Sequence, residues 1–149
     1  MIRGLVVICL LSSACSKAAM PADIDSFVPT VGEQVPGGCR KEFDGRRFEM
    51  RGYLTRSSST SIDRGRVPLT LCAKIDARGE CAGRGARVLV TSPGDIADPQ
   101  SAALRIHTKN GDATAKDVLD VVVEVGTTLD VTKQAVTACE LVLVSATKT

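Results

Sequence analysis

The sequence predicts a mainly β protein, a small five-stranded barrel with one short helix between its third and fourth strands. The chain has 149 residues, which suits a single small domain and excludes the two-domain cleft of a large enzyme. Its hydrophobic fraction of 44% is typical of globular proteins, and its 24% of charged residues is nearly balanced in sign, which argues against disorder. From residue 46 onward apolar and polar residues mostly alternate, which is the period of half-buried strands.

Residues 1–14 are predicted to be a secretory signal peptide. One positive charge, Arg3, precedes an apolar run that ends at Leu11, and small residues follow that run. No apolar run in the chain reaches the roughly 18 residues that a conventional membrane span needs. The opening segment is therefore treated as a targeting signal and left out of the fold.

The segment Leu11-Ser12-Ser13-Ala14-Cys15 resembles the lipobox of bacterial lipoprotein precursors. The resemblance implies cleavage before Cys15 and acyl chains, such as palmitate, on that cysteine, which would anchor the protein in a membrane. Ser16, in place of Asp, then implies an outer-membrane address facing the periplasm. Ordinary cleavage after Ala14 or Ala18 is the alternative, and it would give a soluble secreted protein.

Four cysteines remain after Cys15, and an even number in an oxidising compartment predicts two disulfides. Four cysteines allow three connectivities. We favour Cys72 with Cys81, because a two-residue turn at Asp76-Ala77 would place them opposite each other. Cys39 then pairs with Cys139. No metal site is expected, since the chain has one histidine and no paired metal-binding motif.

Residues 15–38 hold three Pro and three Gly without periodicity, which predicts a tether ahead of a β domain at 39–149. The first strand is expected at 46–55, where apolar residues alternate with charged ones and Gly52 favours a bend. A serine-rich loop follows. The other strands are expected at 67–73, 86–91, 117–131 and 135–145, the last apolar on both faces.

One helix is expected after the third strand. Asp98 can cap it, Pro99 suits its first position, and Asn110-Gly111 would end it. Five strands with this helix give the element order of an OB-fold. The segment Asp44–Leu54 is also similar to the opening strand of bacterial OB-fold envelope proteins, and the last two predicted strands are similar to their fourth and fifth.

Charged residues are unevenly distributed along the domain. Residues 40–87 carry twelve basic and six acidic side chains, whereas 88–149 carry five basic and eight acidic ones. By alternation Arg47, Arg51 and Tyr53 share the solvent face of the first strand, and they are the candidate site for an anionic ligand or oligosaccharide. The alternative is that these arginines only keep an exposed strand soluble.

Nucleic acid is not an expected partner, because OB-type binding uses aromatic platforms and this chain has one Tyr and three Phe.

No catalytic motif is present: there is no GxSxG sequence and no second histidine. The sequence favours a non-enzymatic, lipid-anchored envelope protein without a cofactor, acting as a protein-interaction or binding module. The alternatives are an anion or oligosaccharide binder and, third, a small hydrolase. The partner and the oligomeric state stay open.

Overall fold

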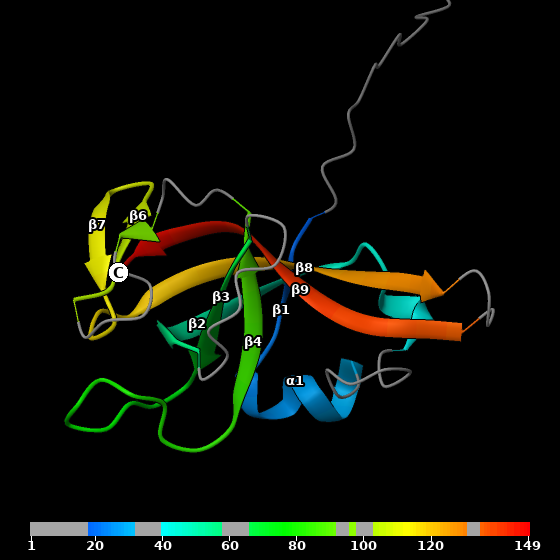
Figure 1. Cartoon of the computed structure of the whole chain (residues 1–149), viewed down its shortest axis with the longest axis horizontal. Helices are drawn as coiled ribbons and strands as arrows, with labels where there is room; N and C mark the ends of the chain where they lie inside the picture. Colours follow the sequence, from blue (N-terminus) through cyan, green and yellow to red (C-terminus); the bar gives the residue numbers. More distant parts are fainter. Residues whose placement is uncertain (1–17, 32–39, 58–65, 92–95, 98–102, 131–134) are drawn as a thin grey trace, which may run out of the picture.

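The computed structural model is mainly β, as the sequence predicts (Figure 1). It describes residues 18–31, 40–57, 66–91, 96–97, 103–130 and 135–149. The helical elements are α1 (Ile24–Val31) and the 3-10 turn η1 (Lys41–Phe43). The strands are β1 (Met20–Pro21), β2 (Arg47–Arg56), β3 (Val67–Cys72), β4 (Gly85–Val90), β5 (Ile96–Ala97), β6 (Arg105–Thr108), β7 (Gly111–Thr114), β8 (Leu119–Asp130) and β9 (Ala135–Lys148).

Strands β2, β3, β4, β9 and β8 pair in that order, and β8 pairs back onto β2, which closes a five-stranded barrel. Neighbouring strands are antiparallel except β4 and β9, which are parallel with Leu89 opposite Val142. The predicted OB-like barrel is confirmed. All five barrel strands lie within three residues of their expected boundaries.

The barrel interior is filled by the inward-facing apolar residues that the alternation predicts. They are Phe48, Met50 and Leu54 of β2; Val67, Leu69 and Leu71 of β3; Ala86, Val88 and Val90 of β4; Leu119, Val121, Val123 and Val125 of β8; and Leu141 and Ala146 of β9. A side chain of this size contributes roughly 1.5–3 kcal/mol when it is fully buried. The core therefore comes from all five strands.

The prediction of a tether over 15–38 is wrong for residues 20–31. Met20 and Pro21 pair in parallel with Phe48 and Glu49 of β2. α1 then packs against β2 and β4, beneath the barrel strands in Figure 1. Ile24 and Phe27 of α1 are buried, and the ring of Phe27 meets that of Phe48 edge-on with centroids 5.2 Å apart.

This segment contains a short amphipathic helix, which its prolines and glycines argued against. Ile24 and Phe27 are three residues apart, which places them on one helical face. Asp23 caps the helix, because its Oδ1 accepts a hydrogen bond from the backbone N–H of Asp25 at 2.8 Å. The domain thus begins by Met20 and not at residue 39.

The helix expected between the third and fourth barrel strands is also wrong where the structure describes that segment. Residues 105–114 form the β6–β7 hairpin, and 98–102 lie outside the described residues. Asn110, predicted to stop a helix together with Gly111, lies in the hairpin turn, and Gly111 begins β7 with a φ of +118°. The side-chain amide of Asn110 also exchanges two hydrogen bonds with the backbone of Lys148, which fixes the hairpin to β9.

Cys72 and Cys81 form a disulfide, as predicted, with Cα atoms 5.9 Å apart. The predicted two-residue turn at Asp76-Ala77 is wrong, because Cys81 faces Ile75 across an antiparallel bridge and the turn runs to Glu80. The Asp76 carboxylate accepts the backbone N–H groups of Arg78 and Glu80, and the bond from Glu80 most strongly lowers its pKa. Cys39 and the side chain of Cys139 lie outside the described residues.

Replacing both Cys72 and Cys81 with serine is expected to lower the free energy of unfolding by roughly 2–3 kcal/mol, since the crosslink closes a short loop. Urea unfolding under non-reducing conditions measures this loss, and reduction of the wild-type protein, which also breaks the predicted Cys39–Cys139 crosslink, should lower the free energy of unfolding further. Non-reducing mass spectrometry should also find no free thiol among the four cysteines beyond Cys15. Two free thiols in the natively exported protein would contradict the predicted framework.

Candidate functional site

The predicted ligand-binding residues all lie on the outer face of β2. Arg51 is exposed, with 69% of its side chain accessible, while Arg47 and Tyr53 are half-buried. They alternate with the inward-facing Phe48 and Met50, as expected for a strand with one buried face. The sequence therefore placed these three side chains on the correct face.

Both arginines are paired with acidic residues of β8. Arg47 is registered opposite Glu124, and its Nε donates to Oε2 at 2.8 Å. Arg51 is registered opposite Asp120 and forms a two-pronged contact, Nε to Oδ1 at 2.7 Å and Nη2 to Oδ2 at 3.1 Å. The hydrogen bond to Asp120 raises the pKa of Arg51, and the same bond lowers the pKa of the Asp120 carboxyl.

These cross-strand pairs make the seam between β2 and β8 nearly neutral. A carboxylate already neutralises each guanidinium that would attract an anion, and the two-pronged contact of Arg51 with Asp120 holds the guanidinium in one orientation. Tyr53 lies beyond Gly52, where β2 pairs with β3, and it is opposite Cys72. The structure thus divides the predicted site between two seams.

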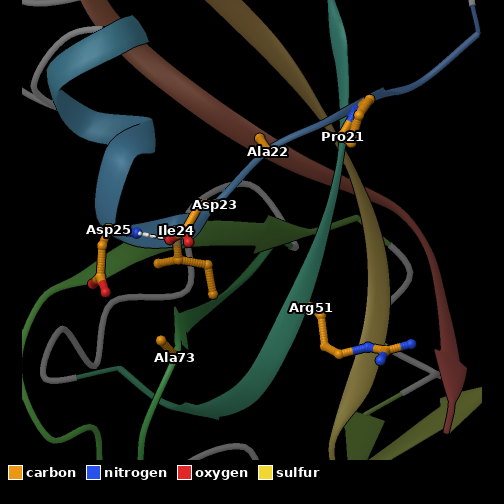
Figure 2. Close-up of a pocket in the computed structure, with 7 residues that line it drawn as sticks. All are labelled: Pro21, Ala22, Asp23, Ile24, Asp25, Arg51 and Ala73. Atoms are coloured by element: carbon orange, nitrogen blue, oxygen red, sulfur yellow. Dashed lines mark hydrogen bonds between the residues drawn. The ribbon is translucent and has the colours of Figure 1, made fainter.

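A cavity of about 440 Å³ lies beside β2 in a region that the sequence assigned to the tether (Figure 2). It is lined by Pro21, Ala22, Asp23, Ile24, Asp25, Arg51 and Ala73. Figure 2 shows the guanidinium of Arg51 turned away from the two aspartates, so its stem lines the cavity. The Asp23 carboxylate is engaged as the helix cap. The cavity is therefore mildly acidic, and its position could be found only once residues 20–25 were known to be structured.

A smaller cavity of about 140 Å³ lies between the end of β4, β6 and β9. His107 lines it from β6. His107 Nδ1 lies 3.0 Å from Asp112 Oδ1, and both side chains are mostly exposed. Ser145 of β9 lines the same cavity.

The aromatic residues leave little surface for stacking a nucleic-acid base. The ring of Phe48 contacts those of Phe27 and Phe43; Phe27 and Phe48 are buried, and Phe43 packs against the core. Tyr53 is the one remaining aromatic residue of the chain. Single-stranded nucleic acids bind such barrels through several stacked rings. The described outer surface can offer one ring.

The disulfide loop covers part of the outer face of β2, β3 and β4. The Sγ of Cys81 lies 3.4 Å from Oγ1 of Thr55. A Cβ atom at Gly85 would lie 2.5 Å from the Thr70 side chain and 3.5 Å from the same sulfur. OB barrels commonly bind ligands on the face of their second and third strands, here β3 and β4. The sulfur of Cys81 occupies part of that face.

Reversing both arginines, with Arg47→Glu and Arg51→Glu, is expected to lower the melting temperature, because each new carboxylate would face an existing one. The matched control reverses the acids as well, with Asp120→Arg and Glu124→Arg, and it should recover most of the loss. Binding of phosphate or heparin is measured on the same variants. An unchanged melting temperature together with lost anion binding would restore the ligand-site interpretation.

Among the described residues no group of three or more His, Cys, Asp or Glu side chains is placed to hold a metal ion. In that same part of the chain, no helix has the length and apolar character needed to cross a membrane. No protein-family model matches the chain, and no curated protein matches its sequence.

Proposed function

We propose that this protein is a lipid-anchored component of the bacterial envelope and acts as a non-enzymatic binding module. The observation that carries the proposal is the opening sequence, a basic start and an apolar run that end in the lipobox-like Leu11–Cys15 segment. Acylation of Cys15 would hold the barrel at the membrane. Its outer surface would then contact another component of the envelope.

The barrel itself supports binding more than catalysis. Arg47 and Arg51 on the outer face of β2 form ion pairs with β8, and a second bidentate pair joins Arg66 to Glu140 of β9. Such pairs fix the shape and charge pattern of a surface, which is what a partner recognises. The paired arginines also give less support to the anion-binding alternative.

The anchor is tested by Cys15→Ala. The variant should leave the membrane fraction, because acyl chains contribute roughly 0.8 kcal/mol per buried CH₂ and no other strong membrane contact is proposed. Ser16→Ala is the matched control and should stay with the membranes. Sedimentation after a high-salt wash measures both. If the Cys15→Ala variant still sediments with the membranes, the lipid anchor is contradicted.

The binding role is tested by crosslinking in intact cells followed by capture of the full-length protein. A reproducible protein partner, lost when Cys15→Ala displaces the barrel from the membrane, supports the proposal. Recovery of a glycan or a phosphorylated compound, with no protein, favours the anion-binding alternative. Turnover of an ester substrate by the purified protein would contradict the non-enzymatic role.

A further inference from the structure

The structure leaves very little chain between the barrel and the proposed anchor; this inference rests on the proposed function. Met20, the first residue of β1, comes only five positions after Cys15. A fully extended segment of that length spans at most about 18 Å. A globular domain of this size is roughly 35 Å across. The point where the chain leaves the barrel therefore stays within about 18 Å of the acylated cysteine while β1 stays in place, which is about half the width of the domain.

β1 is firmly held. Its two residues pair with Phe48 and Glu49, and the backbone N–H of Ala22 donates to Glu49 O at 3.0 Å. Directly after it, Ile24 and Phe27 are 4% and 2% exposed and belong to the core. Releasing β1 to lengthen the tether would thus strain or remove core contacts.

The direction of β1 decides which end of the barrel faces the membrane. Because β1 is parallel to β2 and Met20 lies opposite Phe48, the chain leading back to Cys15 leaves at the end where β2 begins. Residues 40–46, which we call the anchor end, form a series of tight turns there. Nη1 of Arg46 lies 3.9 Å from Sδ of Met20, which places the anchor end beside the exit point.

The anchor end carries more basic than acidic side chains. Arg40, Lys41 and Arg46 are exposed, against Glu42 and Asp44. In Figure 1 β1 leads down to α1, which is capped by Asp23 and carries Asp25 in its first turn. The cavity of Figure 2 adjoins β1 and is lined by Pro21 and the residues that directly follow it.

We propose that the anchor end lies on the membrane surface, with Arg40, Lys41 and Arg46 among anionic phospholipid headgroups. The short tether keeps the anchor end close to the bilayer. The exposed cations are attracted to the anionic headgroups, and this attraction decays within about a Debye length of the surface. The opposite end of the barrel, which carries the β6–β7 hairpin beside Lys148, then faces away from the bilayer and toward a partner.

The native lysines test this orientation without any substitution. The acylated full-length protein is placed in vesicles of phosphatidylethanolamine and phosphatidylglycerol and treated with a membrane-impermeant amine reagent, and labelling rates are read by mass spectrometry. Lys41 should be labelled several-fold more slowly than in the Cys15→Ala protein in solution. Lys74, Lys109 and Lys116, also exposed but far from the anchor end, should be unchanged. Protection of one of these three lysines, or equal labelling of all four, overturns the proposal.

Two controls separate the anchor from the orientation. The mass of the amino-terminal peptide shows whether Cys15 is acylated; an unmodified peptide refutes the proposed function and this inference with it. A Gly-Ser linker of twenty residues inserted between Ser16 and Lys17 adds about 25 Å of reach and should restore the labelling of Lys41. An acylated protein in which Lys41 stays protected despite the linker would contradict a role for the short tether.

Discussion

Phe27→Ala is expected to lower the free energy of unfolding by about 3–4 kcal/mol, because it leaves a cavity beneath the ring of Phe48. Phe27 is 2% exposed, and its ring meets that of Phe48 edge-on. The effect would show that α1 is part of the folded domain. Urea unfolding followed by circular dichroism measures the change.

The matched control is Asp25→Ala, in the first turn of the same helix. The Asp25 side chain is exposed, so its loss should change the free energy of unfolding by no more than about 0.5 kcal/mol. If both variants behaved like the wild-type protein, α1 would not be packed on the barrel, and the tether interpretation of residues 15–38 would stand again.

Gly52→Val is expected to destabilise the barrel by roughly 3 kcal/mol or more, since it forces a branched side chain into a filled space. A Cβ atom at this position would lie 2.5 Å from the backbone oxygen of Cys72 and 2.6 Å from Cδ1 of Ile24. The oxygen belongs to β3 and cannot move without disturbing the pairing. Thermal melting of the purified variant measures the loss.

Gly126→Ala is the control for this substitution, because Gly126 also lies within a long barrel strand. The nearest atom to a Cβ there is the backbone oxygen of Glu140 at 3.9 Å, which is ordinary contact. The variant should be neutral or slightly more stable, since alanine reduces the freedom of the unfolded chain. Equal losses at both glycines would contradict a specific clash at Gly52.

The sequence was sufficient for the barrel strands because each strand carries its own alternating pattern. In β2 the buried Phe48, Met50 and Leu54 follow a period of two, and the bend expected at Gly52 is where the strand changes partner from β8 to β3. The pattern failed where the elements are short. The eight residues of α1 and the four of β6 hold too few periods for a helix and a strand to be distinguished.

The candidate site could be predicted only in part. Alternation places Arg47 and Arg51 on the outer face, but their partners Glu124 and Asp120 lie 77 and 69 positions away. Register between distant strands depends on closure of the whole barrel, which no local pattern encodes. The Figure 2 cavity was missed for a related reason, since it forms only when the segment at 20–25 returns to β2.

The closure of β2 onto β8 also sets the order in which the chain can fold. β2, β3 and β4 can pair as soon as they are made, but the edge of β2 that receives Asp120 and Glu124 stays open until nearly the whole chain is present. Contacts between residues so far apart must first overcome the entropy of closing a long loop, so barrels of this kind fold slowly. Until β8 and β9 arrive, an apolar sheet with an unpaired edge is exposed, and such an edge is prone to pair with other chains. Aggregation during folding is therefore the main risk of this topology. The risk falls once the last thirty or so residues pair with β2 and β4 and complete the barrel.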